Sequence, residues 1–173
     1  AGDQGVYING SGATASTTAA IGFTNEGTME MVSSSGHPVN FYITTGSLVN
    51  NGMFDVQAGA GGARLLSAGL DNGGTFEVGA SMTLGKAGVA HVNSGLFNIS
   101  AGAADAVVKG QSFTNAPGGV ISGLGELDVH LTDSGSLLNN GSVEPGSSPG
   151  VLTVDGDYDQ TSAGKLVIEI AGT

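Results

Sequence analysis

A nine-residue motif that recurs six times constrains the fold of this chain more than any other feature. The motif is apolar-x-Asn-x-Gly-x-apolar-x-apolar, and its clearest copy is LDNGGTFEV at residues 70–78. Its asparagines are 25, 22, 21, 22 and 24 residues apart, with a mean of 22.8; they are Asn25, Asn50, Asn72, Asn93, Asn115 and Asn139. A period of this length is typical of stacked supersecondary units.

The residues inside one period predict strands. In the copies that contain TFEV, MFDV and TMEM, apolar and polar residues alternate as in a half-buried strand, and no copy leaves room for a helix of more than two turns. We therefore expect an all-β, single-domain parallel β-solenoid over residues 1–173, with about 7.6 coils of about 22 residues and three short strands in each coil. Adjacent coils at the usual strand spacing of about 4.8 Å would give a rod about 36 Å long.

Stacking equivalent residues of successive coils predicts columns. A core column of large apolar residues is expected at Met29, Phe54, Phe76, Phe97, Ile121 and Val143. The motif asparagines would stack as an amide ladder, and the motif glycines would mark a corner whose left-handed or tight backbone excludes a Cβ. Residues 1–22 form a weak first coil, residues 23–145 the regular coils, and residues 146–173 a distinct last segment.

Composition excludes several classes of function. The formal net charge is −11 and the isoelectric point is near 4.2, so nucleic acid and anionic membranes are disfavoured as partners. No run of 18 apolar residues is present, so no membrane span is expected. The chain has no cysteine, which leaves neither a disulfide framework nor a thiolate metal site.

The last segment resembles a known class of proteins. PGSSPG at residues 145–150, VLTVDGDYDQ at 151–160 and GKLVIEIAG at 164–172 are similar to a repeat of bacterial autotransporter passengers and related surface β-helix proteins. The Asn-x-Gly coils are similar to the same class. The resemblance implies a right-handed parallel β-helix that is secreted or exposed at a bacterial cell surface, with an adhesive or structural role. We expect no outer-membrane barrel within residues 1–173, and in this respect the sequence departs from full autotransporters.

Two charged columns are expected on the outside of the rod. Glu30, Asp55 and Glu77 would stack as an acidic column, and counting 21 to 23 residues at a time predicts a basic column at Arg64, Lys86 and Lys109. Such stripes would support salt-sensitive lateral association of neighbouring rods. The simpler interpretation is that they are two solvated faces.

Asp155, Asp157 and Asp159 alternate along DGDYDQ and resemble the start of a calcium loop. Gln160 and Leu166 stand where such a loop requires Gly and Glu, so an outward acidic strand is the preferred interpretation and calcium the weaker one. No other cofactor is expected.

An enzymatic role is not expected. Parallel β-helices include polysaccharide lyases and hydrolases, which need clustered carboxylates with a basic residue nearby. His37, His91 and His130 share no column and are interpreted as surface or turn residues. No tryptophan is available to stack against sugars.

The sequence thus favours a structural role through self-association. Solenoid ends carry unpaired strand edges, and the β-prone strand expected at residues 165–170 would pair with the first coil of the next molecule. The interface residues would be Val6, Ile8, Leu166, Ile168 and Ile170. The alternative is a monomeric rod segment of a secreted adhesin that binds glycan or a host surface, and the second alternative is a polysaccharide-active enzyme.

Overall fold

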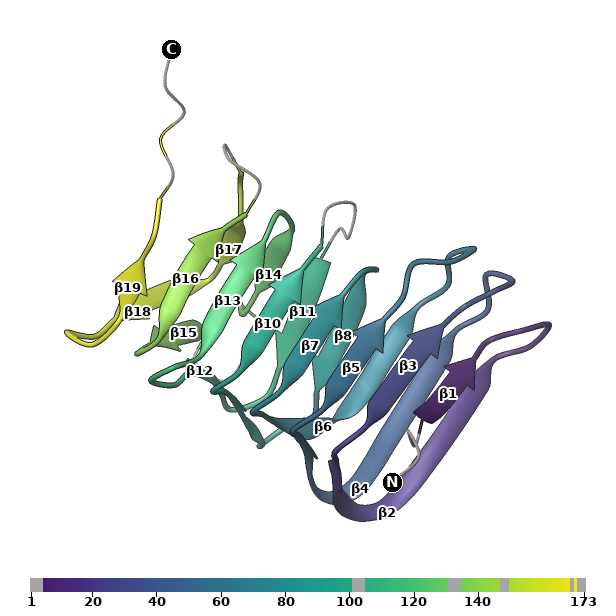
Figure 1. Ribbon diagram of the computed structural model, residues 1–173. Helices are drawn as coiled ribbons and strands as arrows, with labels where there is room; N and C mark the ends of the chain where they lie inside the picture. Colours follow the sequence, from purple (N-terminus) through teal and green to yellow (C-terminus); the bar gives the residue numbers. More distant parts are fainter. Residues whose placement is uncertain (1–4, 101–104, 131–134, 147–149, 169, 171–173) are drawn as a thin grey trace.

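The fold was analysed in a computed structural model that describes residues 5–100, 105–130, 135–146, 150–168 and 170. All nineteen strands that it describes pair in parallel, and the chain winds as a β-solenoid of about seven turns (Figure 1). The expected fold class is confirmed. No helix long and apolar enough to cross a membrane occurs in the described residues.

One strand of every turn belongs to an eight-stranded sheet, here called sheet A. Its order along the rod follows the chain: β1 (Gly5–Asn9), β3 (Thr28–Val32), β5 (Met53–Val56), β7 (Thr75–Val78), β10 (Leu96–Ile99), β13 (Val120–Gly123), β16 (Ser142–Pro145) and β19 (Lys165–Leu166). The strands contain apolar residues at alternate positions, and these point inward, as in the buried–exposed alternation of β7 and β10.

The remaining strands form an eleven-stranded sheet, sheet B, which changes along the rod. Its first three levels are single long strands: β2 (Ala15–Asn25), β4 (Val39–Asn50) and β6 (Arg64–Asn72). The next four levels are pairs of short strands: β8 (Met82–Gly85) with β9 (Ala90–Asn93), β11 (Asp105–Lys109) with β12 (Ser112–Asn115), β14 (Glu126–Asp128) with β15 (Ser136–Asn139), and β17 (Thr153–Asp155) with β18 (Asp157–Gln160).

The expectation of three strands in every coil is therefore wrong for the first three turns. The later turns carry glycines with positive φ at the end of the first short strand or directly after it, at Gly85, Gly110 and Gly156. These backbone conformations are available to glycine at little cost. β2 and β6 contain no such glycine, but β4 runs through Gly46, whose φ is 83°, so a positive φ does not by itself divide the strand.

The core is built from vertical columns. The six residues of the predicted core column are Cα partners in successive strands of sheet A, and all are buried. The rings of Phe54, Phe76 and Phe97 stack face to face, with centroids 4.8 and 5.1 Å apart. The column continues to Val6 at one end and to Leu166 at the other.

The motif glycines are needed for a reason other than the expected one. None of the six has a positive φ. Instead, the corner backbones of successive turns approach so closely that a Cβ added at Gly74 would overlap the carbonyl oxygen of Gly52, and one at Gly95 would overlap that of Gly74. Close vertical stacking of the corners, rather than left-handed backbone, excludes a side chain here.

Candidate assembly interface

The motif asparagines form a continuous buried ladder beside these corners. The Nδ2 of each asparagine donates to the Oδ1 of the next, over five steps of 2.7 to 2.8 Å. The same nitrogen also donates to a backbone carbonyl of the next turn, for example from Asn50 to Thr75 at 2.9 Å. Every amide points the same way along the rod, so the ladder has a donor end toward the C-terminus and an acceptor end toward the N-terminus.

Two residues that the sequence analysis did not assign complete the ladder. Gln160 is the Cα partner of Asn139, one turn above it. The Nδ2 of Asn139 donates to the Tyr158 hydroxyl at 2.9 Å, and this hydroxyl donates to the Oε1 of Gln160 at 2.8 Å. YDQ at residues 158–160 is thus a seventh copy of the apolar-x-Asn signal, with Gln in place of Asn and no glycine two residues later.

The acidic column has the predicted register. Glu30, Asp55 and Glu77 are Cα partners in β3, β5 and β7, and all three are half-buried on the outer side of sheet A. Glu77 accepts hydrogen bonds from Asn98, at 2.8 and 2.9 Å, and from Ser100. The neutral donors of the next turn therefore help to stabilise the Glu77 carboxylate at the end of the acidic column.

The predicted basic column is wrong. Arg64 is only 3% exposed, and its guanidinium donates to the carbonyls of Gly61, at 2.8 Å, and of Gly62. Lys109 pairs with Gly85 rather than with Lys86, and Lys109 is exposed. Equivalent positions in this part of sheet B are not a constant 21 to 23 residues apart, because the loops between strands differ in length. Within the described residues, Arg64, Lys86 and Lys109 therefore do not form a basic column that could face the acidic column of a neighbouring rod.

The three candidate calcium ligands do not lie on one strand. Asp155 ends β17, Asp157 begins β18, and Gly156 forms the corner between them with a φ of 119°. All three aspartates are exposed. In the part of the chain that the structure describes, no group of three His, Cys, Asp or Glu side chains is close enough to hold a metal ion.

His91 is buried, which corrects its interpretation as a surface or turn residue. It is the Cα partner of Leu70 below and of Phe113 above, in an otherwise apolar column. One ring nitrogen, Nε2, lies 2.9 Å from the Lys109 carbonyl oxygen, and Nδ1 has no partner. His91 precedes its motif asparagine by two residues, where the other motif copies have Phe or Leu, and this alignment signals the buried position.

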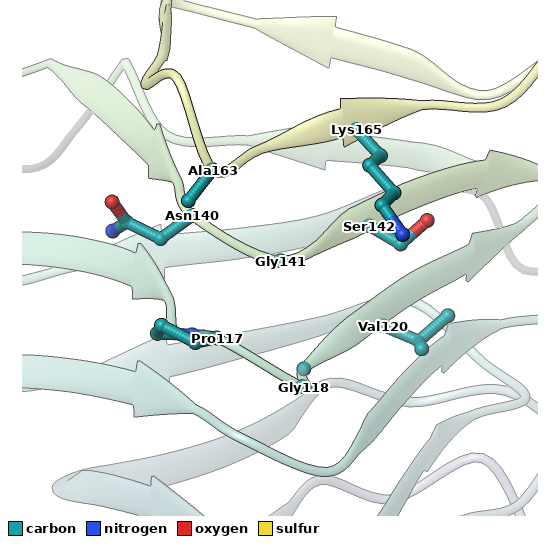
Figure 2. Close-up of a pocket in the computed structure, with 9 residues that line it drawn as sticks. Pro117, Gly118, Val120, Asn140, Gly141, Ser142, Ala163 and Lys165 are labelled. Atoms are coloured by element: carbon teal, nitrogen blue, oxygen red, sulfur yellow. The ribbon is translucent and has the colours of Figure 1, made fainter.

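The surface hollows are shallow. One of about 240 Å³ lies at the corner near the C-terminal end, where Lys165 of β19 extends along Ser142 of β16 and Pro117 protrudes below them (Figure 2). Its floor contains the corner residues Gly118, Gly119 and Gly141. Lys165 is the one charged residue among those that line it. This hollow follows from a corner that must lack side chains. The motif copy at this corner also has three residues between Asn115 and Gly119, including Pro117, where the other copies have one.

In the part of the chain that the structure describes, β1 and β2 form a strand edge without charged residues at the N-terminal end of the rod. β1 and β2 have a paired neighbour on one side only, and residues 5–25 contain no charged residue and no proline. Val6 is 45% exposed although it belongs to the core column, whereas Ile8, also expected in the interface, is only 5% exposed. Natural proteins usually protect such edges with charge, proline or a bulge.

The C-terminal end is an acidic edge with exposed apolar residues. β17 and β18 present Asp155, Asp157 and Asp159, and Leu166 is 47% exposed. The strand expected over residues 165–170 is shorter than predicted, since only Lys165–Leu166 pair as β19. Ile168 and Ile170 follow that strand and are exposed, while residue 169 lies outside the described residues.

Comparison of the chain with protein-family models, with curated proteins and with solved structures finds no match in any of the three.

Proposed function

We propose that this protein is a structural element that stacks head to tail, end against end, into filaments at a bacterial cell surface. The observation that carries the proposal is the pair of unlike strand edges at the two ends of the described residues. The edge formed by β1 and β2 carries no charged residue, whereas β17 and β18 at the other edge carry three exposed aspartates beside β19. Contact between unlike surfaces repeats without closing, so it gives filaments rather than closed dimers.

The charge distribution favours this polarity. Two C-terminal ends that face each other would bring two sets of three exposed aspartates together. Their negative charges would repel each other. An N-terminal end contributes no charge within residues 5–25, so head-to-tail contact avoids the repulsion. The extracellular location rests on the resemblance of residues 145–172 to surface β-helix proteins.

Sedimentation velocity over a concentration series tests the proposal. Growth of fast-sedimenting species with concentration, at two salt levels, is the expected result. A chain that stays monomeric at every concentration would contradict it and would favour the rod segment of a larger surface adhesin.

A further inference from the structure

The two sheets do not contain the same number of levels, and this limits how two copies can stack. Sheet A has eight strands along the rod, whereas the described strands of sheet B make seven levels, from β2 to the pair β17 and β18. The chain alternates between the sheets, so the described strands both begin and end in sheet A. An added copy therefore cannot continue both sheets at once without a change at the interface.

Two arrangements are available. If β1 of the added copy pairs with β19, its β2 lies two strand spacings above β17 and β18 and leaves one level of sheet B empty. If its β2 pairs directly with β17 and β18, its β1 must lie where β19 now lies, on β16. Only the second arrangement leaves every strand edge at the interface paired.

We infer that β19 is a removable cover: it occupies the position that β1 of the next copy takes when the filament forms. This inference rests on the proposed function. Leu166 and Val6 stand at equivalent places, since both extend the core column, one above Val143 and one below Met29. The cover is short, because β19 pairs through two residues while β1 pairs through five.

Few hydrogen bonds hold β19 on β16, and β1 of another copy can form the same ones. The amides of Lys165 and Val167 donate to the carbonyls of Gly141 and Val143, at 2.7 and 2.9 Å. The Lys165 carbonyl accepts from the Nδ2 of Asn139 at 3.1 Å. These are backbone groups, so the backbone of residues 5–7 of another copy offers the same donors and acceptor.

The register of the columns defines the new contact in sheet B. Following the Cα partners along the rod places Tyr158 above Leu137 and Phe23 below Leu48, and places Gln160 above Asn139 and Asn25 below Asn50. Direct pairing of β18 with the next β2 then sets Tyr158 against Phe23, Asp159 against Thr24 and Gln160 against Asn25.

The amide ladder fits this contact in direction as well as position. The Oε1 of Gln160 accepts from Tyr158, and no partner of its Nε2 is found among the described residues. At the other end, the Oδ1 of Asn25 accepts only the Gly27 amide, at 3.2 Å, in the part of the chain that the structure describes. A donor end thus meets an acceptor end, and the ladder continues from one copy to the next.

The first test is a chain that ends at Gly164, compared with the full chain by sedimentation and electron microscopy. Removal of β19 opens the position on β16, so the expected result is filament formation that is at least tenfold faster at the same concentration. Circular dichroism shows whether the shortened chain keeps its β structure.

A disulfide lock keeps the inference testable even if the shortened chain does not fold. Ser142 and Lys165 are Cα partners on the outer side of β16 and β19, and the chain has no other cysteine, so Ser142→Cys with Lys165→Cys ties the cover in place. The matched control is Thr28→Cys with Met53→Cys, which lies in the same outward column but joins β3 to β5. Oxidation should block assembly of the first variant, reduction should restore it, and the control should assemble in both states.

The outcomes separate the inference from the proposed function. If the oxidised lock assembles as fast as the control, or if the full chain assembles and the shortened folded chain does not, β19 is itself the contact and the inference is wrong. If the full chain, the shortened chain and the reduced variants all remain monomeric, stacking itself is wrong.

Discussion

At the scale of single residues, the amide ladder couples each turn to the next through buried polar groups. Asn72 accepts from Asn50 and donates to Asn93 and to the Leu96 carbonyl. Asn72→Ala should lower the free energy of unfolding by about 2 to 3 kcal/mol, because it leaves buried partners without a hydrogen bond. Urea unfolding measures the change. Asn51→Ala is the matched control: Asn51 is exposed, and the one hydrogen bond that its side chain donates among the described residues goes to Glu26, so a loss of more than about 0.5 kcal/mol there would contradict the account.

Substitutions of the adjacent glycines Gly73 and Gly74 test whether glycine is required here because the corners of successive turns pack closely. A Cβ at Gly74 would overlap the Gly52 carbonyl oxygen, whereas a Cβ at Gly73 would lie 3.3 Å from the flexible side-chain oxygen of Asn51. Gly74→Ala should therefore destabilise the rod by about 2 to 4 kcal/mol, while Gly73→Ala should change stability by less than about 1 kcal/mol. Thermal unfolding of both variants is the measurement, and equal effects would contradict the stacked-corner explanation.

His91 makes the stability of the rod depend on pH. Burial lowers the pKa of His91, and the hydrogen bond to the Lys109 carbonyl partly opposes this effect. The unfolded chain, with a histidine pKa of about 6.5, then binds a proton that the folded chain does not. Stability should fall as the pH drops below about 6.5, by up to about 1.4 kcal/mol per pH unit, until the lowered folded pKa is reached.

Unfolding measured between pH 7.5 and pH 5 checks this dependence. His91→Leu, which matches the Leu70 below it, should remove the His91 contribution, whereas His130→Gln at an exposed site should retain it. An unchanged slope in His91→Leu would contradict the assignment.

At the scale of elements, β4 is longer than the strand β6 that pairs with it, and a lysine donates hydrogen bonds to the backbone carbonyls of the extra residues. β4 and β6 stay in register at both ends, but between the paired positions Tyr42/Ser67 and Ser47/Gly69 β4 has four residues and β6 has only one. The extra residues of β4 keep carbonyls that β6 does not reach. The Nζ of Lys86, more than one turn away, donates to the carbonyls of Ile43, at 3.2 Å, and of Thr44.

Lys86→Met keeps the aliphatic length and removes the donors. The expected loss is about 1 to 2 kcal/mol in the free energy of unfolding, because two carbonyls lose a charged donor. Lys109→Met, at an exposed residue for which the structure gives no side-chain hydrogen bond, should have no measurable effect. A loss of similar size in both variants would show that net charge, rather than the capping of β4, is responsible.

The sequence predicts this architecture where the spacing of residues is fixed by a repeated motif. The core column and the asparagines could be placed because each lies within a few residues of a motif glycine, so the lengths of the loops do not matter. Arg64, Lys86 and Lys109 could not be placed by counting, because loops of unequal length lie between them and the nearest motif. Alignment of the motif copies predicts that His91 is buried, because the other copies have Phe or Leu at its position. Its residue type, by contrast, favours the surface.

At the scale of the whole molecule, the rod has a direction that several features share. The amides of the ladder all point toward the C-terminal end, residues 5–25 at one end carry no charge, and β17 and β18 at the other end carry three exposed aspartates. In the proposed filament, these features would give every copy the same orientation. The inferred role of β19 is to set when a filament extends, because the same position on β16 would take β19 of one molecule or β1 of the next.

The axial repeat of filaments, measured by cryo-electron microscopy, tests stacking with displacement of β19 most directly. Each added copy contributes seven levels in that arrangement, so the account predicts an axial repeat of about 34 Å at about 4.8 Å per level. A repeat of about 38 Å, eight levels, would mean that β1 stacks on an undisplaced β19. Isolated short rods at every protein concentration would contradict head-to-tail stacking altogether.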